Sequence, residues 1–110
     1  MLATVRVKTA DAYQALKFLK SASRSARKVD LGFDGASLTF TSGRSSAKCP
    51  GTGQWPGVAR VDRTTLTNAM LFLQDKESEA ELVVEPWELS IGSLRLPSDW
   101  SPLRGPAARI

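Results

Sequence analysis

The sequence lacks histidine and holds a single cysteine, Cys49. Histidine is the side chain that most readily titrates near neutral pH, and it is also the commonest metal ligand. The carboxylates of DKESEAE (75–81) fall in a predicted turn and strand start, without a spacing that suggests a catalytic pair. These features predict a protein that is not an enzyme and that uses no cofactor or metal.

Long apolar runs are also missing. No segment approaches the roughly 20 apolar residues that cross a bilayer. The first residues, MLATVRVK, hold too short an apolar stretch for a signal peptide. One cysteine cannot form an intrachain disulfide, so the sequence gives no support to secretion. We therefore expect a cytoplasmic protein without a membrane partner.

Charge is present in quantity but is unevenly distributed. The 110 residues are 42% hydrophobic and 24% charged, the composition of one folded domain, and the formal net charge is +4. Residues 1–60 carry ten Lys and Arg against three acidic residues, whereas residues 61–110 carry five against eight. This polarity has two interpretations: a basic face for nucleic-acid phosphates, or head-to-tail contact between copies of the chain.

Two segments share one pattern, TVRVKTADAYQALKFLK (4–20) and ARVDRTTLTNAMLFLQ (59–74). Each opens with the alternation of a half-buried strand and continues with apolar residues at helical spacing. The patterns predict helices at about 11–24 and 63–74, the second capped by Asp62.

Three strands are predicted after each helix. They are 28–33, 37–42 and 44–49 in the first half, and 79–85, 88–92 and 94–97 in the second. The Gly- and Pro-rich PGTGQWPG (50–57) is predicted to be a loop.

Constant spacing between matching apolar residues indicates an internal repeat, in which residues 58–98 repeat the pattern of residues 4–50. Apolar residues of the first strand and helix match their counterparts at an offset of 54, and those of the following strands at 51. Examples are Leu16 with Met70, Leu19 with Leu73, Leu31 with Leu82 and Phe40 with Ile91. One β-α-β-β-β unit has too few strands to cover its apolar faces. We therefore expect one α+β domain over 1–102, with two helices side by side on one side of antiparallel sheet, and a flexible tail at 103–110.

The stretch ARVDRTTLTNAMLFLQDKESEAELVVEPWELSIGSLRLPSDW (59–100) resembles a domain of the DNA sliding clamps, the family of the bacterial beta clamp and proliferating cell nuclear antigen. In bacterial clamp domains, too, a Leu-rich helix precedes an acidic strand, a short LSIG-type strand and a strand closing in Leu-Pro. LPSDWSP (96–102) resembles the linker to the next clamp domain. The likeness extends over roughly residues 3–102.

This resemblance implies the DNA-clamp fold, with two pseudo-symmetric β-α-β-β-β units. Six such domains form a ring whose helices line the hole. A ring of this kind performs no catalysis and confers processivity by tethering polymerases and other replication or repair proteins to duplex DNA. Familiar clamp chains carry two or three domains, so a ring of this chain would be a homohexamer.

Basic residues on and after the first predicted helix are candidates for sequence-independent contact with DNA phosphates. They are Lys17, Lys20, Arg24, Arg27 and Lys28. Arg63, at the start of the second helix, is a further candidate for DNA binding. The alternative interpretation is a solvated outer face of an amphipathic helix.

Two further features concern partners. Trp87 lies at a predicted hairpin tip, where a large aromatic side chain is a candidate for contact with a protein partner. The predicted edge strands 44–49 and 94–97 can pair with neighbouring copies, or Lys48 and Arg95 can guard them against such pairing. The expected function is a self-associating, clamp-like DNA-binding protein without sequence preference. The alternative is a protein-binding adaptor that has the clamp fold and does not encircle DNA.

Overall fold

The computed structural model describes residues 2–22 and 26–102. Within these ranges the elements are β1 (Ala3–Lys8), α1 (Thr9–Ala22), β2 (Lys28–Phe33), β3 (Ser37–Ser42), β4 (Ser45–Gln54), β5 (Gly57–Asp62), α2 (Arg63–Gln74), β6 (Glu79–Glu85), β7 (Glu88–Ile91), β8 (Leu94–Pro97) and β9 (Asp99–Pro102). The chain is an α+β domain in which a β-α-β-β-β order occurs twice and a ninth strand follows. The predicted tail at 103–110 lies outside the described residues.

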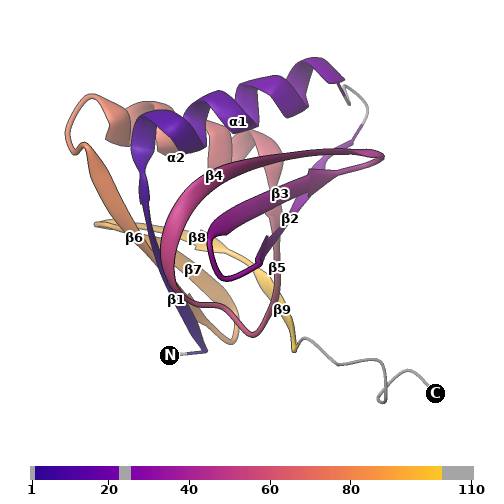
Figure 1. Cartoon of the computed structure of the whole chain (residues 1–110), viewed down its shortest axis with the longest axis vertical. Coiled ribbons are helices and arrows are strands. Elements are labelled where there is room, and N and C mark those ends of the chain that lie inside the picture. Colours follow the sequence, from indigo (N-terminus) through magenta and orange to yellow (C-terminus); the bar gives the residue numbers. More distant parts are fainter. Residues whose placement is uncertain (1, 23–25, 103–110) are drawn as a thin grey trace.

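The nine strands form one antiparallel sheet in the order β8-β7-β6-β1-β4-β3-β2-β5-β9. The two strands at the ends of this order, β8 and β9, follow one another in the chain and are separated by Ser98. The sheet is therefore nearly closed into a barrel. Figure 1 shows α1 and α2 side by side along one side of it.

The interior of the barrel is apolar because strand residues alternate between core and solvent. In β1, for example, Val5 and Val7 are buried whereas Arg6 is exposed. The predicted helix stripes are confirmed except at Ala22, the last expected member of the first stripe, which is exposed. The buried residues of these stripes include Ala12, Leu16 and Leu19 in α1, and Leu66, Met70 and Leu73 in α2. Each large apolar side chain buried in this way contributes on the order of 1.5–3 kcal/mol.

Corresponding strands of the two halves pair in corresponding registers. The paired residues are Val5 with Leu82 in the β1–β6 pair, and Ala59 with Leu31 in the β5–β2 pair. These pairs are related by the offsets of 54 and 51 residues seen in the sequence.

The long strand β4 bends around the molecule (Figure 1). Its first part pairs with β3 and its last four residues pair with β1, where Arg6 lies opposite Thr52. In the second half, two strands make the equivalent two pairings. Strand β8 pairs with β7, and β9 pairs with β5, where Asp99 lies opposite Arg60. Together β8 and β9 therefore occupy the place that β4 occupies in the first half.

The prediction of a loop at 50–57 was wrong, because β4 continues to Gln54. The glycines there serve a close approach of two strands and not a loop. A Cβ atom on Gly53, whose φ is +151°, would lie 2.2 Å from the Thr4 carbonyl oxygen of β1. Glycine fits where backbones meet this closely.

Two other boundaries differ from the prediction. Helix α1 begins at Thr9, whose hydroxyl donates to the Glu77 carbonyl at 2.6 Å, so a contact distant in sequence sets its start. The linker-like segment LPSDWSP contributes β9. There Trp100 packs edge-on against the buried Trp55, with ring centroids 6.0 Å apart.

Candidate nucleic-acid interface

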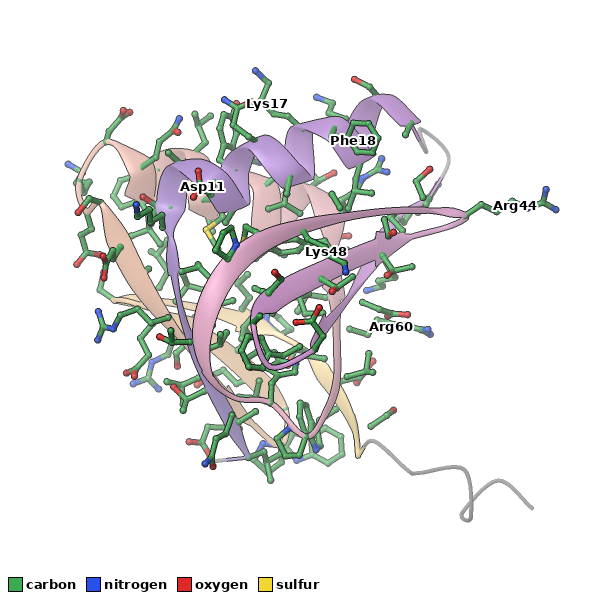
Figure 2. All side chains as sticks on the ribbon, in the orientation of Figure 1. Asp11, Lys17, Phe18, Arg44, Lys48 and Arg60 are labelled. Atoms are coloured by element: carbon green, nitrogen blue, oxygen red, sulfur yellow. The ribbon has the colours of Figure 1, made fainter. Side chains whose placement is uncertain are left out.

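The outer face of α1 presents two of the predicted cations. Lys17 and Lys20 are both exposed, because they lie away from the buried stripe of the helix. The Lys17 ammonium lies 5.5 Å from the centroid of the Tyr13 ring, and Figure 2 shows this lysine projecting away from the sheet. These charges are accessible to a polyanion.

Arg27 and Lys28 lie near the far end of the same helix, where β2 begins, and both are exposed. Arg24 lies outside the described residues. The guanidinium of Arg63 donates to the Leu19 carbonyl at 3.5 Å, so the end of α1 adjoins the start of α2. Lys20, Arg27 and Lys28 therefore gather toward one end of the helix pair, which we call the basic end.

A surface hollow of about 410 Å³ brings Arg27 and Lys28 together with Arg60 of β5. Asp30 also lines it and receives two hydrogen bonds from Arg60, at 2.7 and 3.1 Å. The hydrogen bonds to this carboxylate raise the pKa of Arg60. Thr41 adds a hydroxyl to the wall. The hollow can hold an anion, although Asp30 offsets part of its positive charge.

Sequence reasoning missed Arg60. Its position in GVARVD gave a usable signal, because Ala59 and Val61 are buried and alternation sends Arg60 outward. The missing information was the register, since Arg60 lies opposite Asp30 and next to Lys28 only once β5 pairs with β2.

Arg63 is placed differently from the other cations. Its side chain is buried, at 8% relative exposure, and its guanidinium points to the end of α1. The exposed residues of α2 are all uncharged. They are Thr64, Thr65, Asn68, Leu71 and Phe72. The accessible positive charge of the helix pair thus comes from α1 and the residues that follow it.

The opposite end of the helix pair carries four carboxylates and two cations, Lys8 and Lys76. The hydroxyl of Thr9 bonds the carbonyls of Glu77 and Ser78, so the start of α1 adjoins the segment after α2. The acidic residues of this end are Asp11, Asp75, Glu77 and Glu79. The two ends of the helix pair therefore differ in charge balance, positive at the basic end and negative at this one.

Trp87 is 79% exposed in the turn between β6 and β7, as predicted for a hairpin tip. A hollow of about 180 Å³ lies beside it and is also lined by Lys28, Arg60, Ser98 and Asp99. Trp87 and part of the basic end therefore share one region of the surface.

The edge strands are open on one side along part of their length. Among the described strands, β4 pairs with β3 alone from Ser45 to Pro50, within the predicted edge 44–49 and one residue beyond it. The predicted edge 94–97 is β8, which pairs with β7 alone, and β9 pairs with β5 alone. Two cations near these edges are already engaged: Lys48 with Asp34 at 3.5 Å, and Arg95 with Glu88 at 3.2 Å.

The described residues were also compared with the requirements of a metal site, a reactive thiol and a membrane-spanning helix. No group of three or more potential metal ligands occurs among the described residues. Cys49 is buried, and burial, with a smaller contribution from Asp11, raises the pKa of its thiol to about 12. The described helices include none with the length and hydropathy needed to cross a membrane.

The sequence matches no known protein-family model. A comparison with curated proteins also finds no significant relative.

Proposed function

We propose that this chain is a single-domain, sliding-clamp-like protein whose copies assemble around duplex DNA. The matched pairing of the two β-α-β-β-β runs carries the proposal. It supports a pseudo-symmetric DNA-clamp fold, in which α1 and α2 form one continuous surface for DNA and the strands face away from it.

The contact with DNA is electrostatic. Lys17, Lys20, Arg27 and Lys28 are exposed, long and flexible, and no described residue forms an ion pair with them. Such cations neutralise phosphates without reading bases, which permits sliding. Arg63 is buried at the helix junction, so we assign it to the structure of this surface and not to direct phosphate contact.

Assembly of copies uses the open edges. A strand edge with unpaired backbone groups is a template for pairing with another chain. One half of the molecule offers the first part of β4, which pairs with β3, and the other offers β8, which pairs with β7 in the equivalent place. Different edges on the two sides give head-to-tail contacts, which close into a ring when the rotation between copies permits. Six copies give the six domains of a clamp, and polymerases or repair proteins are the expected clients.

Fluorescence anisotropy with a labelled duplex tests the DNA contact. The double variant Lys17→Glu/Lys20→Glu should lose binding at least tenfold, and the wild-type affinity should fall with log salt at a slope of about −0.9 per phosphate neutralised. The matched control, Lys76→Glu/Arg95→Glu, makes the same change in net charge away from the basic end and should bind more tightly than the first variant. Equal losses in both variants would reduce the effect to net charge and defeat the assignment.

A protein-binding adaptor is the second candidate, and the uncharged outer face of α2 favours it. That face also exposes Phe72 at 50% and Leu71 at 42%. An adaptor would remain a monomer or dimer and would bind a protein partner with little dependence on salt.

A further inference from the structure

The duplication gives the molecule two hollows of one construction. The first, about 270 Å³, lies between β1, β4 and the start of α1. The second, about 180 Å³, lies beside β5 and the junction of β8 and β9. Six residues of the first hollow each have a counterpart in the second: Arg6 with Arg60, Ala36 with Trp87, Pro50 with Pro97, Gly51 with Ser98, Thr52 with Asp99 and Glu79 with Lys28.

Backbone hydrogen bonds confirm this correspondence. The Gly51 amide donates to the Ala36 carbonyl at 3.0 Å, and the Ser98 amide donates to the Trp87 carbonyl at 3.1 Å. Ala36 and Trp87 therefore occupy equivalent places, each in the turn between the two strands that follow a helix. Among the six pairs, alanine and tryptophan differ most in side-chain size.

This difference leaves room in the first hollow and a projecting ring at the second. Trp87 is 79% exposed, so contacts within its own chain do not explain why a large aromatic side chain stands at this position. The first hollow has small or apolar walls in Val7, Ala36, Pro50 and Gly51. A cavity of about 150 Å³ accommodates benzene, so a hollow of 270 Å³ is adequate for an indole ring.

Charges of both signs lie beside the two features. Trp87 lies in a turn flanked by Glu85 and Glu88, and Glu88 pairs with Arg95 at 3.2 Å within its own chain. The first hollow is lined by two cations, Arg6 and Lys8, and by two carboxylates, Asp11 and Glu79, and Arg6 lies 4.0 Å from Glu79. Lys8 forms no ion pair with any described residue and can meet an acidic turn.

We propose that Trp87 of one copy inserts beside Ala36 of the next copy, with the hollow at Arg6 and Lys8 as its receptor. The contact is head-to-tail, because each chain has one projecting ring and one receptor on different halves. It rests on the self-association in the proposed function and names a contact that drives it, but it does not require DNA. A projecting apolar group that meets a pocket elsewhere on an identical molecule gives rings or open filaments.

Complementation between two variants tests this contact. Trp87→Ala removes the projecting ring, and Ala36→Trp fills the receptor from within its own chain. Each variant alone should be a monomer in light scattering after gel filtration, whereas wild type associates. An equimolar mixture should form a 1:1 dimer, because the first variant supplies a receptor and the second a ring. Phe72→Ala removes another half-exposed aromatic ring and should associate like wild type, and Trp87→Phe should restore part of the association.

Three results would overturn the contact: association of Trp87→Ala at wild-type strength, a mixture that stays monomeric, or a wild type that is monomeric throughout. Thermal unfolding of each variant controls for folding. The two proposals fail separately. An intact oligomer of Trp87→Ala would refute this contact and leave the ring, whereas a 1:1 mixed dimer without any DNA binding would refute the clamp function and leave this contact.

Discussion

Arg63 joins the two helices, because its guanidinium donates to the Leu19 carbonyl at 3.5 Å. The last carbonyls of a helix lack partners within the helix, and a cation at this end also interacts favourably with the helix dipole. Arg63 therefore supports the end of α1 from which the basic end extends.

Replacing Arg63 tests this structural role. Arg63→Ala should lower the free energy of unfolding by about 1–3 kcal/mol, because it leaves a buried carbonyl without a charged donor. Urea unfolding followed by circular dichroism measures the change. An unchanged free energy of unfolding together with weaker DNA binding would instead make Arg63 a phosphate contact.

Asp62 caps α2 by accepting hydrogen bonds from the Thr65 amide and hydroxyl, both at 2.9 Å. Asp62→Ala should cost about 0.5–2 kcal/mol of stability, whereas Asp62→Asn should cost less, since both Asp and Asn are good caps. Thermal unfolding of the two variants compares them, and equal losses would argue against a capping role.

The same cap predicts a pH dependence. The Thr65 amide is the largest cause that lowers the pKa of Asp62 in the folded protein. A lowered folded-state pKa means stability that is present above the unfolded pKa of about 3.9 and is lost as pH falls through the folded value. The stability difference between wild type and Asp62→Ala should therefore shrink below about pH 4, and a difference that grows in acid would contradict this assignment.

Alanine at Gly53 tests the close approach of β4 and β1, and alanine at Gly32 in β2 is the matched control. Gly53→Ala places a Cβ 2.2 Å from the Thr4 carbonyl oxygen and should lower the free energy of unfolding by at least about 1–3 kcal/mol. Gly32→Ala meets nothing within 4 Å and should change stability by less than about 1 kcal/mol. Chemical denaturation of both variants measures the contrast, and similar effects would mean that strand separation relaxes easily.

Local patterns were sufficient for the elements that local physics determines. Helix α2 has the predicted bounds, Arg63–Gln74, since the Asp62 cap and the apolar spacing are both within reach of the sequence. Pairing between distant segments was beyond such patterns. The continuation of β4 through Gly51 and Gly53 depends on β1, which lies more than 40 residues earlier in the sequence.

The candidate site shows the same division. The exposure of Lys17 and Lys20 followed from helical periodicity, and the exposure of Trp87 followed from its place in a turn. Arg60 lies beside the basic end because β5 pairs with β2, and Arg63 is buried because it contacts the end of α1. No single stretch of sequence specifies either contact. The correspondence of Ala36 with Trp87 required the three-dimensional pairing as well.

The mass of the wild-type protein in solution tests the central claim most directly. Light scattering over a range of concentrations should approach six times 11.9 kDa, the mass of a closed ring of six chains. A mass of one or two chains at every concentration would contradict the ring.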